Sequence, residues 1–184
     1  MSDRMAGEIR VGGKISLAVV PQLCDAITRE GVSTEWGGGH FRPATTEELL
    51  AAVQPHSDQV PLLCLYDDDA AWGEFASLER FLEEHQIAFT RFSEGKYEYE
   101  PEMVAYRPSS GRIELLTNGN REPVIAPCEL AAVEKELSRI VERARSNTRG
   151  IATAVRKARD LLHDALPPSV PALEPFEIVD GSAS

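Results

Sequence analysis

The sequence predicts an α+β protein, in which a sheet carries helices on one face and a long amphipathic helix follows. Three observations support this class. Residues 15–36 and 62–92 each have the pattern of strand, helix and strand. Residues 97–107 and 112–117 alternate in polarity, as the two strands of an extra hairpin would. From residue 128 onward, apolar residues recur every three or four positions, which is typical of an amphipathic helix.

The first stretch begins within a strand predicted over residues 8–16, where apolar residues alternate with polar residues and glycines. A helix over residues 17–30 follows, because its apolar residues share one face and Gly31 can end it. Residues 32–36 alternate again, which predicts a short strand.

The second stretch is the clearest unit in the chain. It consists of an apolar strand over residues 62–66, an acidic turn, an amphipathic helix over residues 72–85 and a strand over residues 87–92. The residues expected on the solvent side of its helix are Glu79, Glu83 and Glu84.

Two strand–helix–strand halves in succession suggest a split βαβ sheet of the ferredoxin-like type, with its helices on one face. Residues 37–59 would then be an insertion between the halves. A small three-layer α/β fold is the alternative arrangement of the same elements.

The last third of the chain carries a heptad pattern with one polar residue, Asn147. The positions that step by three and four are Leu130, Val133, Leu137, Ile140, Ala144, Asn147, Ile151, Ala154, Ala158, Leu161 and Ala165. Residues 146–150 contain asparagine and glycine, which would instead divide this stretch into a helical hairpin. Because the repeat keeps its phase across these residues, we favour one long helix. The predicted sheet is too small to cover the whole of this long helix. Part of the apolar face of the helix is therefore expected to pack on a second copy.

These elements divide the chain into four segments. They are a frayed N-terminus at 1–7, an α+β domain at 8–126, a long helix or helical hairpin at 127–166, and a proline-rich disordered tail at 167–184.

The composition is that of a soluble globular protein, with 184 residues, 42% of them hydrophobic and 27% charged. No apolar run is long enough to cross a bilayer, and the N-terminus lacks the apolar core of a signal peptide. We therefore expect a cytoplasmic protein without a membrane partner. Cys24, Cys64 and Cys128 fit neither a disulfide framework nor a metal motif, and we expect buried free thiols.

The net charge of −11 argues against nucleic-acid binding by the whole surface. The charge is unevenly distributed, since residues 143–159 contain six basic residues and no acidic one, which leaves −17 on the remainder. An acidic body with a basic segment favours self-association through opposite charges, or a local docking site.

A glycine-rich loop is the candidate binding loop. It comprises Trp36, Gly37, Gly38, Gly39, His40, Phe41 and Arg42. Three consecutive glycines either give mobility or allow backbone conformations that other residues rarely adopt, and the flanking side chains suit ligand binding. The alternative is a flexible surface turn between a strand and a helix.

An acidic cluster is the candidate metal site. It comprises Asp67, Asp68, Asp69 and Glu74, which follow a predicted strand. Carboxylates at the end of a strand suit Mg²⁺, a hard cation that takes oxygen ligands. The alternative, which we favour, is that the aspartates cap the helix that follows. The chain lacks catalytic motifs, and His40, His56, His85 and His163 are far apart in sequence, so catalytic residues stay unknown.

The sequence thus favours a non-catalytic protein-interaction module that needs no cofactor and self-associates or docks a partner through its C-terminal helix. The residues expected to bind the partner are Leu137, Ile140, Asn147, Ile151, Arg143, Arg145, Arg149 and Arg156. One alternative is a Mg²⁺-dependent enzyme that uses the aspartate cluster 67–69. A second is a nucleic-acid-associated protein that binds through the basic segment 143–159, which ranks lower because few aromatic residues interleave with the arginines.

Overall fold

The structure separates the chain into two compact units. The computed structural model describes residues 3–55, 59–96, 99–146 and 150–180, except for the side chains of residues 144–146. One unit, which we call the body, comprises Met1–Arg121 and Val170–Ser184; the other, the hairpin unit, is Glu122–Ser169.

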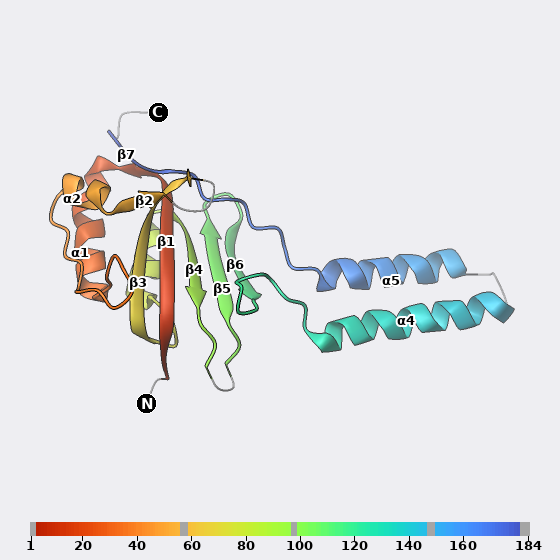
Figure 1. Ribbon diagram of the computed structural model, residues 1–184. Helices are drawn as coiled ribbons and strands as arrows, with labels where there is room; N and C mark the ends of the chain where they lie inside the picture. Colours follow the sequence, from red (N-terminus) through yellow and green to blue (C-terminus); the bar gives the residue numbers. More distant parts are fainter. Residues whose placement is uncertain (1–2, 56–58, 97–98, 147–149, 181–184) are drawn as a thin grey trace. The chain divides into compact units, whose positions relative to one another are not determined.

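The body is built on an open, mostly antiparallel sheet (Figure 1). Its strands, in sheet order, are β2 (Val53–Pro55), β3 (Pro61–Ala71), β1 (Arg4–Ser16), β4 (Ala88–Ser93), β5 (Glu102–Arg107) and β6 (Gly111–Leu116). The predicted extra hairpin is confirmed, because β5 and β6 pair antiparallel with Arg107 opposite Gly111. The α+β class is therefore correct.

Helices cover one face of this sheet. They are a short 3₁₀ helix (Leu17–Val19), α1 (Val20–Glu30), α2 (Thr46–Ala51) and α3 (Ala76–Glu84). The core between helices and sheet combines residues such as Leu23, Leu49 and Leu78 with Ile9 and Leu65 from the central strands. α1 ends where predicted, at Gly31, whose φ of 80° is the left-handed conformation that glycine adopts without strain.

The ferredoxin-like strand order is not confirmed. A split βαβ unit needs parallel strands with another strand between them, whereas β1 and β3 are direct antiparallel neighbours, with Ile9 opposite Leu65. The physical reason lies in the long connection between α1 and β3, after which β3 starts at the end of the sheet where β1 finishes and runs the opposite way.

A further strand, β7 (Phe176–Val179), pairs parallel with the end of β1, from Gly13 to Ser16. The Gly13 amide donates to the carbonyls of Glu174 and Pro175, at 3.0 and 3.1 Å, and Phe176 is buried in the body's core. The expectation of a disordered tail is therefore wrong for this segment, because the apolar residues of the tail complete the sheet.

The hairpin unit contains α4 (Pro127–Ser146) and α5 (Ile151–Ala165), which lie side by side and antiparallel (Figure 1). The favoured single long helix is therefore wrong, and the hairpin alternative holds. Gly150, immediately before α5, has a φ of 83°, a left-handed conformation that interrupts a right-handed helix. The heptad pattern continues from α4 into α5 because, in each helix, residues of the pattern face the other helix.

Candidate functional site

The two helices of the hairpin unit meet along a narrow seam. Its buried residues are Val133 and Ile140 from α4, and Ala154 and Ala158 from α5. At its edge, Glu136 of α4 lies 3.5 Å from the ammonium group of Lys157 and 3.3 Å from Arg139. Two of the four apolar seam residues are alanines, so the helices can lie close together, but they bury little apolar area between them.

A second set of apolar side chains lies outside the seam. This set, which we call the apolar stripe, consists of Leu130, Leu137, Val141, Val155, Leu162 and Leu166. Each of them is between 40% and 54% exposed. Isolated exposed leucines are common on protein surfaces, but six on one pair of helices form a contiguous patch when they share a face.

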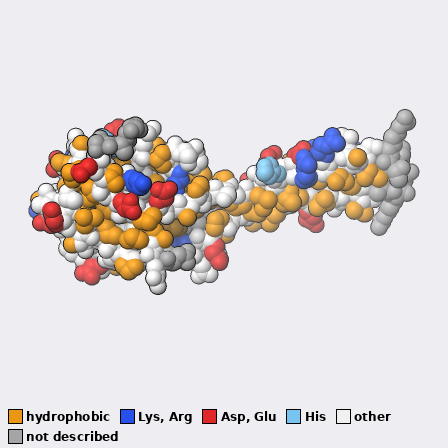
Figure 2. All heavy atoms as spheres, turned by 90° about the horizontal axis from the view of Figure 1, so that it is seen from above, with side chains coloured by type: hydrophobic (Ala, Val, Ile, Leu, Met, Phe, Trp, Pro, Cys, Tyr) orange, Lys and Arg blue, Asp and Glu red, His pale blue; other side chains and the backbone are white. Residues whose placement is uncertain are grey.

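The helical repeat places these residues on one side of the hairpin. In α4, Leu137 follows the seam residue Val133 by four positions, and Val141 follows Ile140 by one. Leu130 precedes Val133 by three positions, which is a turn of about 60° in the same direction. The same offsets hold in α5, where Val155 follows Ala154 by one position and Leu162 follows Ala158 by four. Leu166 lies immediately after α5. One position turns a helix by about 100° and four by about 40°. Because the helices are antiparallel and face each other, equal offsets bring both sets to the same side. Figure 2 shows hydrophobic side chains gathered along one side of the hairpin.

The predicted partner-binding residues fall into three groups. Leu137 lies in the apolar stripe, while Ile140 lies in the seam with Ile151 packed against it. Arg143 and Arg156 are exposed on the helices. The remaining three, which are the side chain of Arg145 together with Asn147 and Arg149, lie outside the described residues.

The acidic cluster lies within a strand rather than in a turn. Asp67, Asp68 and Asp69 belong to β3, which extends to Ala71. Asp67 accepts a hydrogen bond from the Asp69 amide at 2.9 Å, and Asp68 accepts one from the Gly37 amide at 2.7 Å. Glu74 is exposed on the turn that follows. Among the described residues, no group of three or more histidine, cysteine, aspartate or glutamate side chains is placed to hold a metal ion.

The favoured capping role of these aspartates is wrong as well. Helix α3 starts after Phe75, eight positions after Asp67. Its first amide groups donate to other side chains: Phe75 N–H to Glu79 at 3.1 Å, and Leu78 N–H to Glu30 of α1 at 2.8 Å. Burial raises the pKa of Glu30 above its usual value, against the effect of this hydrogen bond.

The glycine loop is fastened to the body at several points. Beyond the Asp68 contact, the Phe41 amide donates to the Val32 carbonyl at 2.7 Å, and the His40 ring contacts the Gly31 carbonyl. The Trp36 ring lies 4.8 Å from that of Tyr66 on β3. Gly37–Gly39 and Arg42 lie at the surface between these anchors. The loop is thus anchored to the body through Gly37, His40 and Phe41 and through the Trp36 ring.

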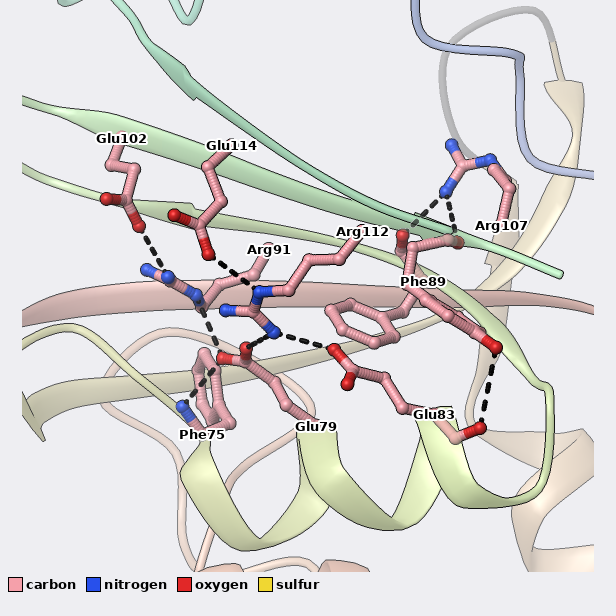
Figure 3. Close-up of polar contacts among 10 residues, drawn as sticks. Phe75, Glu79, Glu83, Phe89, Arg91, Glu102, Arg107, Arg112 and Glu114 are labelled. Carbon is pink, nitrogen blue, oxygen red and sulfur yellow. Dashed lines mark hydrogen bonds and ion pairs between the residues drawn. The ribbon is translucent and has the colours of Figure 1, made fainter. Parts of the chain in front are cut away.

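A buried network of charges is the feature that sequence reasoning missed (Figure 3). Arg91 on β4 is only 1% exposed, and its guanidinium lies 2.9 Å from Glu79 of α3 and 2.5 Å from Glu102 of β5. Arg112 on β6 adds contacts to Glu79 at 3.1 Å and to Glu83 at 2.7 Å. Glu79 is buried, which corrects its predicted place on the solvent side.

One signal in the sequence pointed to this network. Phe89 and Arg91 are two positions apart on one strand and therefore lie on the same face of it. The sequence thus places a charged side chain on an apolar face, where it needs a partner that the sequence does not identify. Sequence alone gives no register between β4 and α3, and so did not identify Glu79. The network joins the helix layer to the sheet, with Arg91 and Glu79 enclosed at its centre and Arg112 at its partly exposed edge, which makes it a structural element.

A second charged group lies on the sheet face opposite the helices. Glu8 is buried and pairs with Arg10 at 2.5 Å and with Arg121. Both guanidinium groups also lie over the Phe92 ring, at 4.7 and 4.9 Å. Burial acts to raise the pKa of Glu8, but the two arginines outweigh it and hold that pKa below its usual value.

One hollow of the body lies where the C-terminal segment crosses the sheet. It is a cavity of about 330 Å³ between the ends of β1 and β5 and the segment 171–174. Arg107 lines it, but its guanidinium donates to the carbonyls of Pro171 at 2.9 Å and Phe89 at 2.6 Å and to the hydroxyl of Thr90 at 3.0 Å. This arginine therefore holds the segment before β7 against the sheet.

The cysteines divide by exposure. Cys24 and Cys64 are buried free thiols, as predicted, whereas Cys128 is exposed on α4. Burial raises the pKa values of the Cys24 and Cys64 thiols, which disfavours the reactive thiolate in both.

Comparisons with protein-family models, with curated proteins and with solved structures find no match to this chain. Among the helices in the described part of the chain, none has the length and apolarity required to cross a membrane.

Proposed function

We propose that the protein is a non-catalytic protein-interaction module and that the apolar stripe of its hairpin unit is the docking surface. The observation that carries this proposal is the stripe itself: six leucine and valine side chains, each about half exposed, on one side of two helices. A seam with only four buried apolar residues, two of them alanines, stabilises the hairpin weakly, so a partner that covers the stripe adds apolar burial that the hairpin lacks.

The chemistry of the stripe defines the kind of partner. Its residues repeat at helical spacing, and side chains of this type accept the apolar face of another amphipathic helix. The partner we propose is therefore helical, with leucine or valine at the same spacing.

The two alternative functions have less support. The carboxylates proposed to hold Mg²⁺ accept hydrogen bonds from backbone amides of β3 and of the glycine loop. In the basic segment, Lys157 pairs with Glu136 and Arg159 pairs with Asp160 at 2.7 Å. These contacts leave less positive charge for phosphate groups than the sequence suggests.

Site-specific crosslinking tests the docking surface without assuming the partner's identity. A photoreactive phenylalanine analogue replaces Leu137 in the full chain, which is then irradiated inside the native cell. We expect a covalent adduct, because a docked partner lies against this position. The matched control carries the analogue at Ala131, which is exposed on the same helix about 120° away from Leu137.

An adduct at position 137 and none at position 131 supports the docking surface. Equal adducts at both positions, or none at either, would show that the stripe is not a docking surface.

A further inference from the structure

We infer that the partner is a second copy of this chain, with the two hairpins packed stripe against stripe as a four-helix bundle. In this bundle α4 of each copy lies beside α5 of the other. The inference rests on the proposed function, and names the occupant and its orientation.

The stripe is arranged in layers that suit such a bundle. The seam sets the level of each residue, because Glu136 lies opposite Lys157 and Ile140 contacts Ala154. By the same register, Leu130 lies at the level of Leu162, and Leu137 at the level of Val155. Each of these two layers thus has one apolar side chain from each helix, and a second copy brings two more to each, which is how bundle cores are filled.

Net charge permits this contact between identical chains. Residues 122–169 contain eight basic and seven acidic residues, a net charge of +1, so the body holds nearly all of the acidic excess. Two hairpins can therefore approach each other without the repulsion that two bodies experience.

Charged side chains at the two edges of the stripe select the orientation. Glu134 follows the seam residue Val133 by one position and lies at the α4 edge. Arg159 follows the seam residue Ala158 by one position and lies at the α5 edge. Both are exposed, and the register that pairs Glu136 with Lys157 puts them at the same level along the hairpin. The Arg159 guanidinium also contacts Asp160 within α5, but both of these side chains are more than half exposed, so Arg159 can still reach a carboxylate of the second copy.

Only one of two face-to-face arrangements joins opposite charges. A two-fold axis parallel to the helices puts α4 beside α5 of the second copy, antiparallel, with Glu134 opposite Arg159 at both edges. A two-fold axis perpendicular to the helices puts α4 of one copy beside α4 of the other. The edge that carries Glu134 then faces the same edge of the second copy, and the edge that carries Arg159 also faces its counterpart. Like charges at these positions are unfavourable, so the first arrangement is selected.

The test measures the dimer dissociation constant of the purified full chain by light scattering and sedimentation. We expect a dimer. Leu137→Glu should raise the dissociation constant by roughly 30-fold or more, as loss of a central interface residue does. Ala131→Glu adds the same charged side chain to an exposed site of α4 outside the stripe, and should leave the constant unchanged. Circular dichroism shows whether both variants keep their helices.

A charge-reversal cycle then tests the orientation. Glu134→Arg and Arg159→Glu should each raise the dissociation constant by about tenfold, because each puts like charges at both edges. The double variant Glu134→Arg with Arg159→Glu should restore the dimer, since opposite charges face each other again. Single variants without effect, or a double variant weaker than either, would overturn the proposed orientation.

The failure of this inference is distinct from that of the proposed function. A full chain that stays monomeric at high micromolar concentration overturns the second copy as the partner. If crosslinking at position 137 then gives an adduct with a different protein, the docking surface stands with another occupant. A dimer that Leu137→Glu does not weaken would place the interface between copies elsewhere and also overturn the inference.

Discussion

Arg91 shows how one side chain joins two layers of the body. It is 1% exposed, and two carboxylates, from α3 and β5, surround its guanidinium (Figure 3). The Nε atom lies near Glu79 without forming a hydrogen bond in the described contacts, so the attraction there is that of an ion pair. A buried charge of this kind is tolerable only while its partners stay in place.

We predict that Arg91→Ala lowers the free energy of unfolding by about 3–5 kcal/mol, because it leaves the buried carboxylate of Glu79 with less compensation. The comparison variant is Arg112→Ala, which removes a guanidinium of the same network that is 35% exposed. That change should cost about 1 kcal/mol or less, since solvent screens the exposed part of the pair. Denaturation by guanidinium chloride measures both. Equal losses would show that burial does not set the importance of these arginines.

At the residue scale, the sequence predicts which face of a strand or helix a side chain lies on better than it predicts which side chains it contacts. The alternating strand over residues 87–92 was predicted, and it put Arg91 on an apolar face. The carboxylates that neutralise Arg91 come from positions 12 residues before and 11 after it, on elements whose contact depends on tertiary packing. The same limit explains the aspartates, which were assigned to a cap because the end of β3 could not be located.

At the scale of elements, the close packing of β1 against the segment before β7 depends on a glycine. A Cβ atom on Gly12 would lie 2.3 Å from the Glu174 carbonyl oxygen and 2.9 Å from the Leu62 side chain. The adjacent Gly13 donates its amide to Glu174 and Pro175. The strap formed by residues 170–175 therefore approaches the β1 backbone at a distance that only glycine permits.

We predict that Gly12→Ala displaces the strap and β7, with a loss of about 1–3 kcal/mol of stability from overpacking. Hydrogen exchange should accelerate at the Gly13–Ser16 amides, while the amides in the centre of β3 keep their protection. Gly39→Ala is the matched control, because a Cβ atom there meets nothing within 4 Å. Unchanged exchange at Gly13–Ser16 would show that the strap accommodates a methyl group.

Most elements of the body were predictable because their apolar periodicity is strong, as in α1, β4 and the β5–β6 hairpin. The directions of the strands and the points at which helices end were harder to predict from the sequence. The order β3-β1-β4 depends on the end of the sheet at which β3 starts, which no periodic pattern encodes. The break between α4 and α5 was visible as Gly150, but the unbroken heptad outweighed it. A pattern shared by two contacting helices is indistinguishable from one pattern on a single helix.

At the scale of the whole molecule, the hairpin unit is an insertion into the body. The chain leaves the body after Arg121 and rejoins it at Val170. Among the described residues, the core of the body contains Phe176, which lies beyond the insertion, while Ile140, Ala154 and Ala158 of the hairpin unit form a cluster of their own. The two units therefore have separate cores.

We predict that the body stays folded when residues 122–169 are replaced by a flexible glycine–serine linker, because the two units have separate cores. A linker of about 12 residues has a typical end-to-end distance of about 20 Å. The shortened chain should unfold cooperatively in urea and should be monomeric. A collapse of the cooperative transition would show that the hairpin contributes to the body's stability. A dimer would show that the body also self-associates.

The pairing of β1 with β7 has a consequence for the order of folding. Gly13 and Phe176 are neighbours in the sheet but 163 positions apart in sequence, and the entire hairpin lies between them. Contacts that close such long loops form late, whereas a helical hairpin depends on local contacts and forms early. In a folding chain, the apolar stripe is therefore expected to form before β7 joins its sheet. Two chains that dimerise as we propose would then meet through their hairpins first, and each would finish its sheet already beside the other.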